Sequence, residues 1–261
     1  MGGGCGNQGA FALTRSWSKM SIMQAYANPT RFLNLTQPLV PWLWAVTIGL
    51  FATGLIMGWN APPDYQQGET VRIMYVHVPA AWSAMMVYTI MAIASATGFI
   101  FRHPLADAAA KTAATFGAVF TFLALVTGSI WGEPMWGTWW VWDARLTSMF
   151  VLFLLYLGYM AIWQAIEEPQ RAARIAGIIA IAGFINIPII KFSVDWWNSL
   201  HQPASVFRMD GPTIAPELLW PLLIMGLAYT FLFLVLHLTA IKTEITSRRI
   251  RQMRIANIRE L

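Results

Sequence analysis

The sequence predicts an all-α integral membrane protein with six transmembrane helices. Only 11% of its 261 residues are charged and 57% are hydrophobic, whereas soluble domains carry about 25% charged residues. The apolar residues also gather in long runs, and about 20 such residues let a helix cross the hydrocarbon core of a bilayer. Sparse charge and long apolar runs together indicate a chain embedded in a membrane.

Six apolar stretches are predicted to be the spans. The fifth is the shortest and is weakened by Asn186 and Pro188. It is retained because Lys191 at its end can extend to the interface, and because six spans give a consistent charge distribution. The predicted spans cover residues 40–59, 79–101, 112–131, 146–166, 175–190 and 218–241.

The distribution of Lys and Arg predicts the orientation. With the N-terminus inside, thirteen of the 17 basic residues fall on inner segments and four on outer segments. An excess of Lys and Arg marks the cytoplasmic side, so both termini are predicted to be cytoplasmic. Three outer, periplasmic loops follow, at about 60–78, 132–145 and 191–217.

The chain is predicted to form one membrane domain, residues 36–242, with an outer tryptophan-rich loop at 131–145. A cytoplasmic tail, 1–35, precedes it, and a basic cytoplasmic tail, 243–261, follows it. Residues 1–20 lack the apolar region of a signal peptide and are interpreted as a disordered tail or a start-site extension. The basic tail is interpreted as a topology determinant near anionic lipid or a docking segment for a cytoplasmic partner, and no nucleic acid is expected.

Several classes of chemistry lack their sequence signals. No acidic or basic residue lies well inside a predicted span, which argues against proton or ion transport. The single Cys5 cannot form an intrachain disulfide, and no CxxC, CxxCH or P-loop motif is present. Any ATP hydrolysis is therefore assigned to a partner, no enzymatic activity is predicted, and function is expected at the outer surface.

Two of the four histidines are predicted to lie on the outer side. His77, in VRIMYVHVPAAW, is predicted at the rim just before the second span, which Pro79 opens. His201 occupies a similar place in DWWNSLHQPAS. Each alone fits an ordinary surface histidine, but with an aromatic loop on the same face they are interpreted as ligands. His103 and His237 are interpreted as ordinary interfacial residues.

The stretch WGEPMWGTWWVWDAR, residues 131–145, contains five tryptophans. An interfacial aromatic belt would explain scattered tryptophans, but not this density between Gly132, Pro134 and Gly137. The helical spacing of Trp136, Trp139, Trp140 and Asp143 predicts a short amphipathic helix that presents indoles as a platform.

Haem matches this combination of side chains. Its flat ring stacks on indoles, and its iron accepts imidazole nitrogen as an axial ligand, so two histidines could bind opposite faces. Arg72, Arg145 and Arg208 are on the correct side to meet the propionates, and the sequence favours none of them.

The motif W-G-x-P-M-W-G-T-W-W-V-W-D-A-R-L-T-S resembles the tryptophan-rich "WWD" signature of the haem-handling proteins of cytochrome c biogenesis. The six-span length and the segments YVHVPAAW and SVDWWNSLHQ look most like the family of cytochrome c maturation protein C, also called haem exporter protein C. The resemblance extends from about residue 40 to 241.

This resemblance implies that the chain binds haem b transiently, as a substrate, at the outer face of the bacterial inner membrane. His77 and His201 would be the axial ligands. The chain would present haem to a periplasmic chaperone, cytochrome c maturation protein E. It would work beside the ATPase and permease subunits, cytochrome c maturation proteins A and B, and the single-span protein D. The implied haem-binding residues are His77, His201, Trp131, Trp136, Trp139, Trp140, Trp142, Asp143 and Arg145.

Two alternatives stay open. A cytochrome b-like electron-transfer subunit would hold haem between histidines inside the spans, where only His237 comes close. A structural membrane subunit of an ABC transporter would have no haem site of its own. Asp143 would cap or orient its loop or contact a partner, or it would simply pair with Arg145.

Overall fold

The computed structural model describes residues 28–259 of the chain, and within them every regular element is helical. The prediction of a disordered segment at 1–20, and Cys5 with it, lies outside these residues. In chain order the elements are α2 (Pro29–Thr36), α3 (Leu39–Asn60), the 3-10 helix η1 (Glu69–Ile73), α4 (Met74–Phe101), α5 (Pro104–Trp136), α6 (Ala144–Ala165), α7 (Pro169–Gly183), α8 (Asn186–Trp196) and α9 (Pro216–Arg259).

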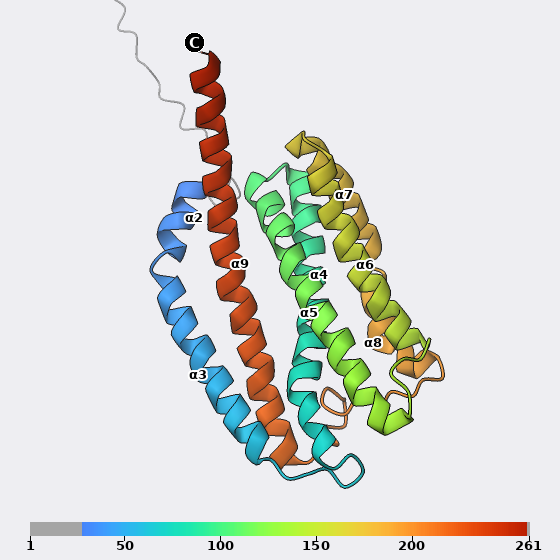
Figure 1. Ribbon diagram of the computed structural model, residues 1–261. Helices are drawn as coiled ribbons and strands as arrows, with labels where there is room; N and C mark the ends of the chain where they lie inside the picture. Colours follow the sequence, from blue (N-terminus) through green and yellow to red (C-terminus); the bar gives the residue numbers. More distant parts are fainter. Residues whose placement is uncertain (1–27, 260–261) are drawn as a thin grey trace, which may run out of the picture.

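Within residues 28–259, six helical stretches are long and apolar enough to cross a membrane, which confirms the predicted number. They run roughly side by side in Figure 1, and the connections 61–68, 137–143 and 197–215 all lie at the lower end of the bundle in that view. These connections correspond to the three predicted outer loops. The orientation of the bundle in a membrane stays a prediction. The stretches are Leu39–Asn60, Glu69–Phe101, Pro104–Trp136, Ala144–Ala165, Pro169–Trp196 and Pro216–Ile258.

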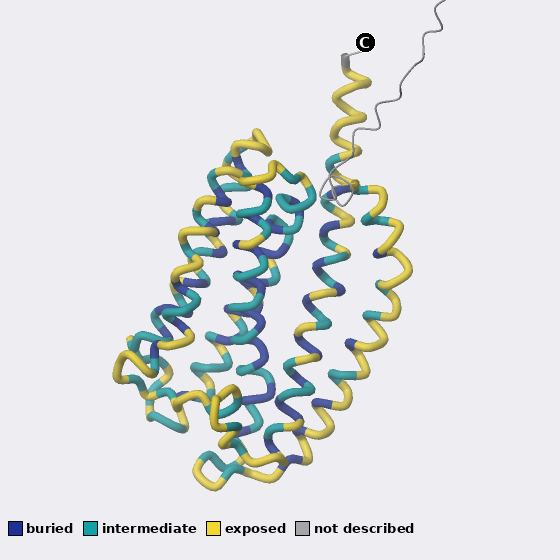
Figure 2. The backbone as a smooth tube through the Cα atoms, turned by 180° about the vertical axis from the view of Figure 1, so that it is seen from behind, coloured by how far each residue is buried: buried dark blue, intermediate teal, exposed yellow. Residues whose placement is uncertain are grey.

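The helices α4 and α5 form the centre of the bundle. The fully buried side chains of Val87 and Met91 come from α4, and small residues of α5 such as Ala113 and Gly117 lie close to their neighbours. The outermost helix, α3, buries just Thr47, Gly54 and Gly58 and packs mainly against α9. Figure 2 shows this gradient of burial, with α3 and the projecting end of α9 mostly exposed.

The second span begins earlier than predicted. Helix α4 starts at Met74, directly after η1, so Pro79 lies inside the helix rather than at its start and His77 lies in the first turn. A proline this close to a helix start removes one hydrogen bond, to the carbonyl four residues earlier. Burial of Met74 and Tyr75 favours the extra turn.

The fifth span, which was predicted as one continuous stretch, is broken in the structure. Helix α7 ends at Gly183 and α8 begins at Asn186, so Pro188 lies in the first turn of α8, where its missing N–H breaks no helical bond. The buried Asn186 side chain donates a hydrogen bond of 2.8 Å to the carbonyl of Ser148 in α6. This bond satisfies a polar group that would otherwise destabilise a helix inside the membrane.

The last helix continues past the predicted span into the predicted basic tail and ends at Arg259. At the end of the bundle opposite the tryptophans, Glu244 of α9 accepts from Lys111 of α5 at 2.9 Å and from Arg248 at 2.8 Å. The pair of Lys111 with Glu244 joins α9 to α5, so the described part of residues 243–261 is a helical extension of the bundle.

Candidate functional site

His77 is held by α5. Its Nδ1 lies 3.0 Å from the carbonyl oxygen of Ala124 and 3.2 Å from Oγ1 of Thr127. Because a carbonyl oxygen accepts but cannot donate, Nδ1 carries the proton and the neutral ring keeps its lone pair on Nε2. The imidazole also meets Trp131 edge-on, with ring centroids 5.6 Å apart. His77 therefore has one nitrogen committed to the protein and one available to a ligand.

His201 is held by a carboxylate. Its Nδ1 lies 3.1 Å from Oδ2 of Asp143, and its ring meets Trp136 at a centroid distance of 4.8 Å. The hydroxyl of Ser199 donates to the same Oδ2 and accepts from the backbone N–H of His201. Here too Nδ1 donates and Nε2 stays available. A carboxylate behind an imidazole is the arrangement that orients histidine ligands in metal sites.

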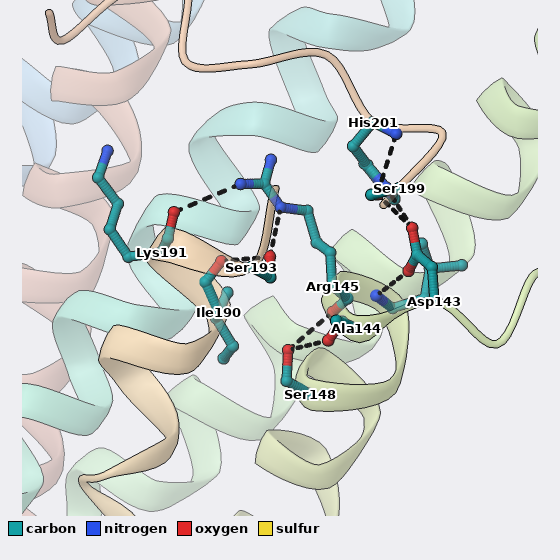
Figure 3. A network of polar contacts seen from close by, with 10 residues as sticks. Asp143, Ala144, Arg145, Ser148, Ile190, Lys191, Ser193, Ser199 and His201 are labelled. Carbon is teal, nitrogen blue, oxygen red and sulfur yellow. Dashed lines mark hydrogen bonds and ion pairs between the residues drawn. The ribbon is translucent and has the colours of Figure 1, made fainter. Parts of the chain in front are cut away.

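Asp143 has two structural roles, and Figure 3 shows both of them. Its Oδ1 accepts from the backbone N–H of Leu146 at 2.8 Å, which caps α6, while Oδ2 holds His201. Burial alone would raise the pKa of this carboxyl. The hydrogen bonds from Ser199, from Leu146 N–H and from His201 outweigh it and hold the pKa below its usual range. The prediction that Asp143 caps or orients its loop is thus confirmed.

The alternative pairing of Asp143 with Arg145 does not occur within residues 28–259. The guanidinium of Arg145 instead donates to Oγ of Ser193 at 3.2 Å and to the carbonyl of Lys191 at 3.5 Å, so it joins α6 to α8 (Figure 3). Its charge nevertheless acts on both His77 and His201.

Burial sets the protonation of His201. Loss of solvent lowers the pKa of its imidazole and the charge of Arg145 acts in the same sense, while Asp143 opposes them only in part. The ring is consequently neutral at pH 7. Neutral imidazole is the form that binds a metal ion.

The tryptophan-rich segment is organised differently from the prediction. Helix α5 continues through Gly132 and Pro134 to Trp136, so Trp131 and Trp136 lie on a helix rather than in a loop. Gly132 leaves room for the Trp136 ring, because a Cβ at this position would lie 2.9 Å from it. Gly137 then ends the helix in a left-handed conformation with φ of 71°.

The predicted amphipathic helix over 136–143 is wrong, since residues 138–143 are not helical. Trp139, Trp140 and Trp142 instead border an apolar groove of about 550 Å³ between α5 and α6. On α5 the groove is lined by Phe122 and Val126, which project from a different face of the helix than Ala124 and Thr127. The five tryptophans thus form two groups, with Trp131 and Trp136 at the histidines.

The other two outer arginines are each paired with a carboxylate. Arg72 pairs with Glu69 at 2.7 Å and lies over the ring of Trp59. Arg208 pairs with Asp210 on the surface, and this pair raises the pKa of Arg208 through a hydrogen bond to Asp210. Of the three candidates for a propionate, Arg145 is the one whose charge acts on both histidines.

Three contact residues were missed from the sequence. Gln67 accepts from Nε1 of Trp131 at 3.0 Å, Thr127 contacts His77, and Ser199 joins His201 to Asp143. Ser199 alone had a local signal, because a serine two residues before a histidine can accept its backbone N–H in a tight turn. The other two depend on contacts between segments far apart in sequence.

The fold and site define a multi-pass α-helical membrane protein with a cluster of histidine and tryptophan at one end of its bundle. The model of the family described as "Heme exporter protein C" (CcmC) matches residues 22–256. The chain belongs to this family. Its members are haem-handling membrane proteins and components of cytochrome c maturation.

Curated bacterial relatives agree with this assignment, and each is named Heme exporter protein C. The chain is 59% identical to that of Bradyrhizobium diazoefficiens over 229 residues, which are 88% of this chain and 87% of the relative. It is 44% identical to the protein of Paracoccus denitrificans over 88% of this chain and 96% of the relative. It is 46% identical to the protein of Escherichia coli K12, over 74% of this chain and 80% of the relative.

Proposed function

We propose that this chain binds haem as a transient substrate at the outer face of the bacterial inner membrane and presents it to a periplasmic haem chaperone. One observation carries the proposal. His77 and His201 each use Nδ1 to bond the protein, keep Nε2 available, and lie against a tryptophan of the last turns of α5. Two such nitrogens are the donors that a haem iron accepts on its two faces.

The remaining site residues are each assigned a different contact with the haem or with its ligands. Trp131 and Trp136 border the porphyrin beside its axial ligands, and Asp143 orients His201. Arg145 supplies a positive charge that acts on both histidines and is the assigned donor to a propionate. The three groove residues would meet the apolar edge of the ring, where indole faces suit a flat aromatic ligand; they are Trp139, Trp140 and Trp142.

The partners follow from the family. Membership in a haem exporter family supports a role beside cytochrome c maturation proteins A, B and D, with haem passed to protein E. In this scheme the chain orients the ring and holds the iron, and a separate subunit hydrolyses ATP. The excess of Lys and Arg on the segments opposite the tryptophans supports a periplasmic site and cytoplasmic termini.

A cytochrome b-like role is disfavoured by the position of His237. Its Nε2 lies 2.8 Å from the carbonyl of Ala109, and its ring stacks on Phe233. His77 contacts Ala124 of the same helix, fifteen residues further on, which is about 22 Å at the helical rise of about 1.5 Å per residue. These two histidines therefore cannot bind one iron.

The visible spectrum of the full chain tests the proposal. The chain, purified in detergent from haem-replete membranes, should carry haem with a Soret band and, when reduced, separate α and β bands. Titration of haem-free protein with haemin should give the same spectrum at an equimolar ratio. A purified chain that shows neither co-purifying haem nor saturable haemin binding would overturn the proposal.

Alanine at Trp136 or Trp131 is expected to lower haem retention, because each ring contacts an axial histidine. An aromatic pair contributes about 0.5–1.5 kcal/mol beyond its buried area, or roughly a factor of two to twelve in affinity. Trp142→Ala is the comparison variant and should cause a smaller loss, since this residue is 71% exposed and lies in the groove group, away from the axial histidines. Haemin titration of the three variants measures the difference. Equal losses of affinity in all three would contradict the division of the tryptophans into a histidine group and a groove group.

Haem affinity is expected to stay level from about pH 7.5 down to about pH 6.5 and to fall only at lower pH. Proton and iron compete for Nε2, and burial holds the pKa of His201 below its ordinary value of 6.5. Asp143, whose pKa is also lowered, stays ionised throughout this window. Haemin titrations over this pH series check the prediction, and an affinity that already declines above pH 6.5 would contradict it.

A further inference from the structure

The imidazole of His77 lies in a notch on α5 that glycine makes possible. A Cβ built at Gly128 would lie 2.8 Å from Cε1 of His77 and 3.3 Å from its Nδ1. Real Cβ contacts are not this short, so any larger residue at position 128 forces the ring to move. Nε2 lies farther from that position, at 3.8 Å. The ring therefore enters the notch by its Nδ1–Cε1 edge and turns Nε2 away from α5.

Thr127 completes the notch by accepting from the ring. Its hydroxyl donates to the carbonyl of Leu123 at 2.6 Å, one turn earlier on α5. With its proton used there, Oγ1 faces Nδ1 of His77 as an acceptor, beside the carbonyl of Ala124. Both contacts favour the same tautomer, with the proton on Nδ1 and the lone pair on Nε2.

The third wall of the notch is an indole. Trp131 lies one turn beyond Gly128 on α5, meets the imidazole edge-on at an interplanar angle of 74°, and is itself held by Gln67. The ring of His77 is thus fixed in position, tilt and tautomer by α5. His201 is held differently, by a carboxylate and a hydroxyl.

We propose that Gly128 and Thr127 are positioning residues that aim Nε2 of His77 at the haem iron. The inference rests on the proposed function, in which His77 is an axial ligand. Gly128 supplies the space that lets the Nδ1–Cε1 edge of the ring lie close to α5, and Thr127 supplies the acceptor that fixes its tautomer. Neither residue touches the haem in this account. Residues that hold a metal ligand in place without touching the metal change metal affinity by about 10–100-fold when they are replaced.

The test uses the full chain loaded with haem in detergent and compares Gly128→Ala with two matched controls. Gly158→Ala and Gly49→Ala add the same methyl group where no other atom lies within 4 Å. We expect Gly128→Ala to lower haem affinity at least about tenfold and to convert part of the ferric low-spin signal to high-spin. The controls should keep the wild-type affinity and spin state.

Thr127→Val tests the same notch without adding bulk, since valine has the shape of threonine but cannot accept from Nδ1. It should shift the midpoint potential and weaken haem binding, and Thr127→Ser should restore both. If Gly128→Ala and Thr127→Val keep the wild-type spectrum and affinity while His77→Ala loses them, the positioning role is wrong and the ligand assignment stands. If His77→Ala itself changes nothing, the proposed function fails.

Discussion

Alanine in place of both His77 and His201 is expected to remove nearly all haem from the purified chain, and each single replacement should remove most of it. Each imidazole offers one Nε2, so a single replacement loses one of two bonds to iron. The loss of haem affinity should exceed the roughly 10–100-fold that results when a residue behind a metal ligand is replaced.

The haem content per chain, measured as the pyridine haemochrome, checks this expectation. His103→Asn is the matched control, because His103 caps the start of α5 at the other end of the bundle, and asparagine can also cap. The control should keep the wild-type haem content. A double variant with wild-type haem content would show that haem is held elsewhere.

Asp143→Ala is expected to have the second largest effect, because one carboxylate serves two structures. Loss of the α6 cap should cost about 1 kcal/mol of stability, seen as a lower melting temperature in detergent. Loss of the acceptor behind His201 frees its ring to rotate and to exchange tautomers, which should lower haem affinity about 10–100-fold.

Asp143→Asn separates these two effects. Its amide oxygen can still cap α6 by accepting from Leu146, but it lacks the negative charge that stabilises a ligated imidazole. We therefore expect near-normal stability with reduced haem affinity. Ser199→Ala should cause a smaller loss, since it removes a bond to Asp143 but leaves the contact of Asp143 with His201. A wild-type affinity in Asp143→Asn would contradict the orienting role.

The sequence predicted those features that local composition determines. Long apolar runs define six spans whatever their partners are, but the break before Asn186 inside the fifth span was not predicted. The number and order of the predicted spans placed His77 and His201 at the same end of the bundle. Because successive spans run in opposite directions, every second connection lies at the same end of the bundle.

Contacts between distant segments were not predictable. Ala124 lies 47 residues from His77, and Asp143 lies 58 residues from His201. No pattern within a few residues encodes such pairs. The prediction of a helix from Trp136 to Asp143 failed for a local reason. It relied on the helical spacing of the tryptophans and did not take account of Gly137, whose left-handed conformation ends α5. The glycine therefore ended the helix although the spacing of the tryptophans was helical.

The central claim is that His77 and His201 bind the same iron, and the spin state of the ferric haem tests it most directly. Low-temperature electron paramagnetic resonance of the haem-loaded chain should show a low-spin signal, as two imidazole ligands produce. His77→Ala and His201→Ala, loaded with excess haemin, should each show high-spin iron instead. A low-spin signal that persists unchanged in either single variant would contradict the claim.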